Sequence, residues 1–135
     1  MSKDWVKDIS DMHEKYGVKP VVEKFDANKL ATYLQFRVNF LQEELDELKH
    51  SSQDDPSEIV DALIDLCVVA IGTLDAFEID AYTAWDRVLE ANMNKKVGVK
   101  ESRPNPLGLP DLIKPEGWTA PSHEDNIGLL HKIYK

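Results

Sequence analysis

Cysteine is almost absent from this 135-residue sequence, which excludes folds that depend on disulfide bonds. Cys67 is the only cysteine, so no intramolecular disulfide can form, and this fits a reducing compartment. Long hydrophobic runs are also missing. The most apolar segment, residues 59–74, contains Asp61 and Asp65 and is shorter than the roughly 20 residues that span a bilayer. The N-terminal residues are charged throughout, unlike a secretory signal. We therefore expect a cytoplasmic protein with no membrane partner.

Positive charge is in short supply as well. The chain has 16 basic and 25 acidic side chains, and its formal net charge is −9. Such a field repels nucleic-acid backbones, so we expect no nucleic-acid polymer as a partner. A small polyanionic substrate would need local cations, for example divalent metal ions held by carboxylates.

Glycine and proline are scarce between residues 21 and 97, where only Pro56 and Gly72 occur. Near Gly98 the character of the chain changes, because five of the seven prolines lie beyond it and prolines prevent long helices. No alternating strand pattern is visible. We expect an all-α fold of four to five helices in one domain over residues 1–135, with a helical core over about 1–97 and an irregular, Pro-rich C-terminal arm over about 98–135.

Apolar periodicity and capping residues predict where these helices lie. The first should end at Gly17, and Asn28 should cap the second. Trp85, Val88 and Leu89 should point inward from the fourth. The predicted helices cover about residues 4–16, 28–50, 56–77 and 80–94, and residues 124–134 contain one short helix.

The second predicted helix carries acidic side chains at the edge of its apolar face. At about 100° per residue, its leucines form a stripe that faces the core. Glu44 borders this stripe, Glu47 lies one turn further round, and Arg37 falls at the inner edge. Asp46 points away and is ordinary surface. Glu44 therefore needs an explanation other than solvation.

The third predicted helix is apolar around nearly its whole circumference and should be buried on all sides. Glu58, Asp61 and Asp65 nevertheless form one acidic line at spacings i, i+3 and i+7. Unpaired carboxylates in an apolar interior cost several kcal/mol each, so protons, cations or metal must neutralise them. A short connection makes the two helices antiparallel neighbours, so their acidic lines can face each other. All-oxygen ligation suits Mg²⁺ or Mn²⁺.

Plainer interpretations apply to some of these residues. Charge-rich helical segments are most often solvated surfaces. Asp65 could instead support the other carboxylates or bind a neighbouring subunit. On the fourth helix, Asn92 continues the inward stripe and Lys95 and Lys96 follow it, so these residues either bind phosphate or simply complement the helix dipole. The four histidines lack metal-ligand spacing and should be surface residues.

Three segments together resemble the MazG-like pyrophosphohydrolases. Glu44-Leu-Asp-Glu47 followed by Glu58-Ile-Val-Asp61 is similar to their ExxE…ExxD signature, Glu43 completes an EExxE, and residues 91–96 look like their phosphate-binding helix end. These proteins belong to the all-α nucleoside triphosphate (NTP) pyrophosphatase superfamily, which also contains the phosphoribosyl-ATP pyrophosphohydrolases. The resemblance is closest to phage-type, MazZ-like members, which would place the protein in the host cytoplasm. The Pro-rich arm is not part of the minimal domain.

The resemblance implies a metal-dependent reaction. Glu44, Glu47, Glu58 and Asp61 would hold two or more Mg²⁺ or Mn²⁺ ions per site, with Asp65 behind them. Glu43 and Glu47 would act catalytically, Glu43 as the general base for water attacking the α-phosphorus. Lys95, Lys96, Asn92 and Arg37 would contact the phosphates. The expected reaction converts a (deoxy)nucleoside triphosphate, with (d)GTP the first candidate, to the monophosphate and pyrophosphate.

Two other functions stay open. Hydrolysis of phosphoribosyl-ATP would use the same carboxylates, and a non-enzymatic module would use its acidic helices to bind a basic partner. In either case the apolar third helix of so small a chain should bury surface against another subunit. We expect a homodimer or homotetramer.

Overall fold

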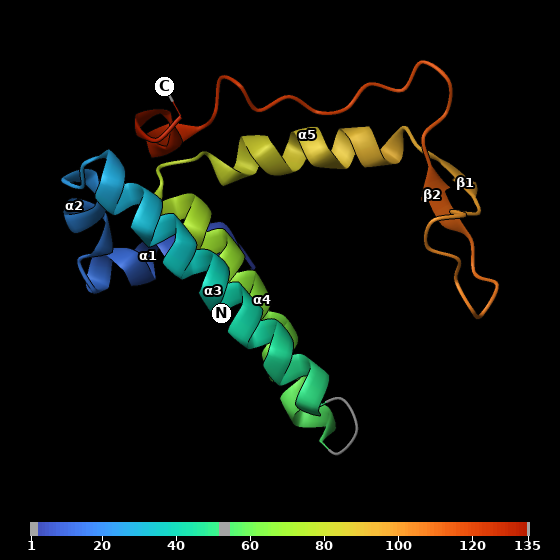
Figure 1. Ribbon diagram of the computed structural model, residues 1–135, viewed down its shortest axis with the longest axis horizontal. Coiled ribbons are helices and arrows are strands. Elements are labelled where there is room, and N and C mark those ends of the chain that lie inside the picture. Colours follow the sequence, from blue (N-terminus) through green and yellow to red (C-terminus); the bar gives the residue numbers. More distant parts are fainter. Residues whose placement is uncertain (1–2, 52–54, 135) are drawn as a thin grey trace. The chain divides into compact units, whose positions relative to one another are not determined.

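The computed structural model describes residues 3–51 and 55–134, and this part of the chain is mainly helical (Figure 1). The elements are α1 (Trp5–Lys15), α2 (Val18–Glu23), α3 (Ala27–Ser51), α4 (Pro56–Ala76), α5 (Ala81–Met93), β1 (Lys96–Gly98), β2 (Asp111–Ile113) and a short 3₁₀ helix, η1 (Gly128–Lys132). The predicted all-α fold class is confirmed. Within the described ranges, no helix combines the length and hydropathy needed to cross a membrane.

The chain forms two compact units, which we describe separately. The first contains Met1–Ala81 together with Ile127–Lys135, and the second contains Tyr82–Asn126. In the first unit, α3 and α4 run side by side as a helical hairpin, and α1 packs against α4 (Figure 1). The two helices that carry the predicted acidic lines are therefore neighbours.

The core of the first unit lies at the end of the hairpin where α3 begins and α4 ends. Val22, Leu30, Phe77 and Leu129 are buried against one another there. Leu129 brings η1 into this core, and its backbone N–H donates to the Phe77 carbonyl at 2.7 Å. Gly128 has φ +50°, and a Cβ at this position would collide with that same carbonyl. Residues 128–132 thus belong to the helical core, although the sequence placed them in the arm.

Side-chain caps explain where the two long helices begin. The Asp26 carboxylate accepts from the Lys29 backbone N–H at 2.9 Å, so Asp26 and not the predicted Asn28 caps α3. At α4, Asp55 accepts from Ser57 at 2.9 Å, and Pro56 occupies the first turn, where no intrahelical donor is needed. These capping interactions fix the start of both hairpin helices.

The C-terminus of α4 has no glycine to mark it. Glu78 adopts a left-handed backbone, with φ +58°. The Ile79 N–H reaches the Leu74 carbonyl at 3.0 Å and the Glu78 N–H reaches the Asp75 carbonyl at 3.0 Å, which together form a Schellman motif. A glutamate thus occupies a position that normally favours glycine.

Several predicted burial patterns are wrong. The third predicted helix is not buried on all sides in this chain, because Val60, Leu63 and Ile64 on α4 are 62%, 48% and 45% exposed. On α5, Trp85 is 67% exposed and does not point into a core. Val88 and Leu89 beside it are also exposed. Amphipathic spacing identifies an apolar face but does not say whether the same chain covers it.

Three elements of the structure were not predicted from the sequence: α2, β1 and β2. The six-residue helix α2 follows Gly17, whose φ of +69° ends α1 as predicted. β1 and β2 pair antiparallel, with Lys96 opposite Ile113 and Gly98 opposite Asp111. In the sequence Gly98 only marked the change of character of the chain, but in the structure its missing Cβ leaves room for the Ile113 side chain. Strands of three residues are too short to show an alternating pattern.

In the second unit, the arm returns alongside α5 (Figure 1). The Trp118 indole N–H donates to the Ala91 carbonyl at 2.7 Å. Further along, both terminal nitrogens of Arg87 donate to the Asp125 carboxylate, at 2.6 and 2.9 Å. The Pro-rich segment is therefore attached to α5 at two points.

Candidate active site

The α3–α4 hairpin brings the predicted carboxylates to one region of the first unit. We call Glu44, Glu47, Glu58, Asp61 and Asp65 the acidic cluster. A hollow of about 460 Å³ opens beside it, and its described lining consists of Glu47, His50, Ser51, Glu58, Asp61 and Ala62. Residues from two helices thus meet at one surface, as expected from the short connection between the helices.

Glu44 is the member whose surroundings are most unusual. Its Oε2 atom is buried and has no hydrogen-bond partner. Burial raises the pKa of the Glu44 carboxyl, and the charges of Glu47, Asp65 and Asp61, together with a hydrogen bond to Glu47, raise this pKa further. Glu44 on α3 therefore interacts electrostatically with the carboxylates of Asp61 and Asp65 on α4.

This environment fits a cation. An uncompensated buried carboxylate oxygen among other carboxylates would be stabilised by a positive ion, and hard divalent cations prefer oxygen donors. In the described residues, however, no three acidic, histidine or cysteine side chains converge closely enough to hold a metal ion as they stand. Glu47, Glu58 and Asp61 are exposed, so their side chains have room to rotate. Glu43, the predicted general base, is also exposed and is not part of the hollow's described lining.

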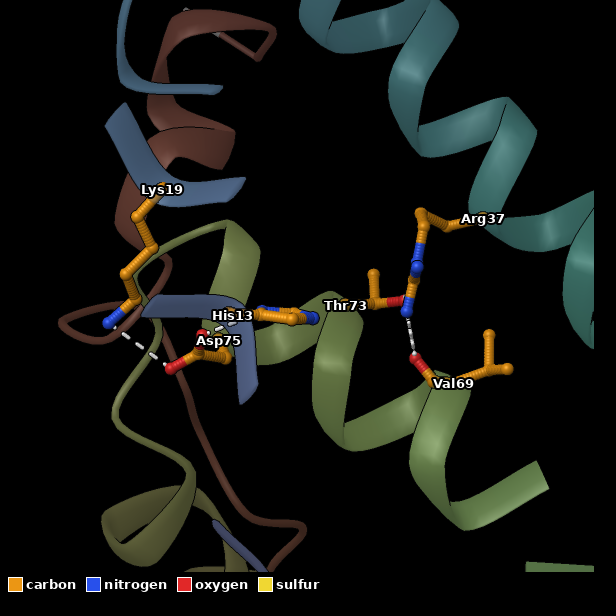
Figure 2. A network of polar contacts seen from close by, with 6 residues as sticks. All are labelled: His13, Lys19, Arg37, Val69, Thr73 and Asp75. Carbon is orange, nitrogen blue, oxygen red and sulfur yellow. Dashed lines mark hydrogen bonds and ion pairs between the residues drawn. The ribbon is translucent and has the colours of Figure 1, made fainter. Parts of the chain in front are cut away.

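Arg37 lies two turns before Glu44 on α3 and joins α3 to α4 (Figure 2). Its Nε donates to the Thr73 hydroxyl and its Nη2 to the Val69 carbonyl, both at 2.9 Å. The guanidinium carbon lies 5.5 Å from the centre of the Phe40 ring. Two of the three guanidinium nitrogens therefore donate hydrogen bonds to α4.

A second polar network continues from this point towards α1 and α2 (Figure 2). The Asp75 carboxylate contacts His13 Nδ1 at 2.8 Å and Lys19 Nζ at 3.2 Å. Asp75 and His13 are 9% and 6% exposed, so the expectation that His13 lies at the surface is wrong. Gly72 lies between the two networks, since a Cβ there would be 2.7 Å from Arg37 Nη2 and 3.3 Å from His13 Nε2.

Sequence reasoning missed Asp75, although a signal for it existed. The acidic line on α4 runs through Asp61 and Asp65 to Gly72 at spacings of four and seven residues, and Asp75 follows on the same face three residues later. At this end of the line, the Lys19 ammonium pairs with the Asp75 carboxylate and the His13 ring hydrogen-bonds to it. At the other end, the described residues place no such cation against Glu44.

The predicted phosphate-binding residues at the end of α5 belong to the second unit. The Lys95 N–H donates to the Asn92 carbonyl at 3.1 Å, just beyond the last turn of the helix. Lys96 is exposed and begins β1, so it does not continue the helix. The Lys95 ammonium lies 5.3 Å from the centre of the Trp118 ring. Contact between these residues and the acidic cluster stays a prediction.

Comparison with models of known protein families shows to which family the chain belongs. Residues 18–92 match the phosphoribosyl-ATP pyrophosphohydrolase family. The chain belongs to this family. The match covers α2, α3, α4 and nearly all of α5, and hence every residue of the acidic cluster. No curated protein and no solved structure matched the chain.

Family membership establishes the general chemistry. The family lies within the MazG-like all-α NTP pyrophosphatase superfamily, and this chain is accordingly a nucleotide pyrophosphohydrolase. Such enzymes generally depend on divalent metal ions. The family match ends at Asn92, so Lys95, Lys96 and the Pro-rich arm lie outside it.

Proposed function

We propose that this pyrophosphohydrolase cleaves a (deoxy)nucleoside triphosphate to the monophosphate and pyrophosphate in a divalent-metal-dependent reaction, with (d)GTP as its preferred substrate. The observation that carries the metal requirement is the buried, unpartnered Glu44 oxygen next to Glu47, Asp61 and Asp65. A half-buried carboxylate that has one buried oxygen, and no cation against it among the described residues, is poorly compensated without a metal ion. The (d)GTP preference rests on the resemblance to phage-type members.

Glu44, Glu47, Glu58 and Asp61 would hold Mg²⁺ or Mn²⁺, with two or more ions per site. Bound there, the ions would neutralise polyphosphate charge and lower the pKa of a water molecule. Glu58 and Asp61 are one turn apart on α4 and both line the hollow, as does Glu47 from α3. Asp65 is half-buried, one turn after Asp61 on α4, and would orient the neighbouring carboxylates.

The remaining roles fall to groups around this cluster. Glu43 would take the proton from the attacking water, with Glu47 beside it on the same helix. Lys95, Lys96 and Asn92 would bind phosphate oxygens and stabilise the negative charge that develops on the leaving pyrophosphate. Arg37 would contribute mainly by holding α3 to α4, because its Nε and Nη2 already bond to α4, and its remaining nitrogen could contact phosphate.

Phosphoribosyl-ATP is the second candidate substrate, and the family description favours it. Both reactions cleave the bond between the α- and β-phosphates, so the same carboxylates serve either one. What separates them is recognition of the base and ribose. A panel of NTPs, dNTPs and phosphoribosyl-ATP with Mg²⁺, analysed for monophosphate and pyrophosphate, decides between them.

We also propose that the chain works as a homodimer or homotetramer in a reducing cytoplasm. Val60, Leu63 and Ile64 form an exposed apolar strip on α4. Contiguous exposed apolar residues of this kind typically mark an interface. Light scattering coupled to size exclusion gives the mass, and a monomer at micromolar concentration would contradict this part of the proposal.

The catalytic proposal is tested with matched variants. Asp61→Asn and Glu58→Gln keep side-chain size but remove a charge, so each should lower Mg²⁺-dependent pyrophosphate release by at least about 100-fold. Asp46→Asn is the control, since Asp46 is exposed on α3 and contacts Gln42 instead. It should retain full activity.

Metal binding provides an independent readout. Titration calorimetry with Mn²⁺ should show saturable binding that Asp61→Asn weakens and Asp46→Asn does not. If Asp61→Asn hydrolyses every substrate in the panel at the native rate, the assignment of the cluster is wrong. Stoichiometric binding of a basic partner, without metal binding or hydrolysis, would favour an interaction module instead.

A further inference from the structure

A pair of lysines and a tryptophan come together in the second unit, outside the acidic cluster. The Lys95 and Lys114 ammonium groups lie 5.3 and 5.1 Å from the centre of the same Trp118 ring. Lys95 follows α5, whereas Lys114 and Trp118 come from the arm after β2. The indole is held in place by its N–H bond to Ala91, so the arm fixes this arrangement on α5.

The ion pairs formed by the described residues do not include Lys95 or Lys114. Both ammonium groups lie within 5.3 Å of one ring centre, so each adds to the positive potential around Trp118 and they repel each other. A bound anion would remove the repulsion.

The local sequence is basic although the whole chain is acidic. Residues 95–114 contain five basic and two acidic side chains, against a net charge of −9 for the full chain. One of the basic residues, Arg103, is already paired with Asp111 at 2.7 Å. Of the four basic residues that remain, Lys95 and Lys114 lie at the Trp118 ring.

An open cavity of about 700 Å³ adjoins the same tryptophan. Its described lining includes Trp118, Ala91 and Asn94, together with Pro115 and Gly117 from the arm. This volume lies within the range of small-molecule sites. The lining combines an aromatic ring and apolar groups with amide, hydroxyl and carboxylate groups, the carboxylates being those of Glu90, Glu116 and Asp125, of which Asp125 is paired with Arg87. Such groups can accept hydrogen bonds from ribose hydroxyls and base N–H groups, and the phosphates would lie at the two lysines, which are not part of this lining.

We propose that Lys114 and Trp118 of the arm join Lys95 to form a nucleotide-binding site, in which the two ammonium groups hold the polyphosphate and the adjacent cavity takes the nucleoside. This inference rests on the proposed function only in extending the phosphate-binding role of Lys95. It gives the Pro-rich arm a direct part in ligand binding. Lys114 and Trp118 lie beyond the family match, so they would distinguish this chain from the minimal domain.

Binding without metal separates this site from the acidic cluster. In EDTA the cluster repels phosphates and hydrolysis stops, so calorimetry at low salt with inorganic triphosphate and with dGTP reports on the lysine site. The native chain should bind both ligands, and dGTP more tightly. Lys114→Gln should weaken binding of each about tenfold, and Lys114→Arg should restore it.

Two controls make the result specific. Lys100→Gln removes the same charge from the same segment without touching Trp118 and should change affinity less than about twofold. Glu58→Gln alters the acidic cluster and should leave metal-free binding unchanged, even if it abolishes hydrolysis. No metal-free binding of either ligand, or equal losses for Lys114→Gln and Lys100→Gln, would overturn the site. Equal affinity for triphosphate and dGTP would overturn the role of the cavity.

Discussion

Replacing Gly72 with alanine tests how the polar networks hold the helical hairpin together. In the interior of an exposed helix this change stabilises a protein by about 0.5–1 kcal/mol, because alanine loses less backbone entropy on folding. Here the new Cβ would lie 2.7 Å from Arg37 Nη2 and 3.3 Å from His13 Nε2. The guanidinium must move, although it donates two hydrogen bonds, to Thr73 and Val69.

Losing one of those charged hydrogen bonds costs about 1.5–3 kcal/mol. The gain in helix propensity offsets only part of this loss. Gly72→Ala should therefore lower the free energy of unfolding by about 1–2 kcal/mol, as measured by urea denaturation. In an Arg37→Leu background the contact at 2.7 Å is gone and only the milder one to His13 at 3.3 Å is left, so the same substitution should cost clearly less or be neutral. The double-mutant cycle should show a coupling of at least about 1 kcal/mol. A Gly72→Ala protein as stable as the native one, or an equal cost in both backgrounds, would refute this account.

Three further predictions concern the same unit. Glu78→Gly should raise the free energy of unfolding by about 1 kcal/mol by relieving the left-handed backbone at the end of α4, whereas Glu78→Ala, which keeps a Cβ, should gain less in the same denaturation assay. A hydrogen bond to Glu23, burial and the Glu23 charge raise the pKa of Glu78, so protonation favours the folded state and stability should rise as pH falls through that raised pKa. Glu23→Gln should flatten this dependence in thermal melts, and an unchanged pH profile would contradict it. Asp75→Asn should cost about 1–3 kcal/mol by weakening the buried contacts to α1 and α2, while Asp11→Asn, which breaks only an exposed pair, should leave the denaturation midpoint unchanged.

The helices were predictable where periodicity and capping act over many residues. The third predicted helix, over about residues 56–77, agrees with α4 at Pro56–Ala76, because Pro56 starts it and an apolar pattern continues through it. The cap of α3 was misplaced by two residues, since Asp26 and Asn28 are both good caps and only the fold shows which side chain turns back to the helix. β1 and β2 were missed because pairing across 12 intervening residues leaves no local trace.

Burial was the least predictable property. The spacing of the apolar residues showed that α4 is apolar around nearly its whole circumference, which predicted a fully buried helix. In the single chain, however, the Val60 side chain on α4 is 62% exposed. His13 gave no sign of burial, because its partner Asp75 is 62 residues away. Likewise, nothing local indicates that Lys114 and Lys95 share the ring of Trp118.

The sequence by itself determined the helical class, the two acidic lines and the family, because these depend on residue type at short, regular spacing. It also identified Glu44 as a carboxylate in the wrong place for a solvated residue. Only the tertiary structure showed that one Glu44 oxygen is buried without a hydrogen-bond partner while Asp75 is paired with Lys19 and hydrogen-bonded to His13. The physical reason is that neutralisation depends on which charges meet across elements, and the distances between elements are set by packing and not by sequence spacing.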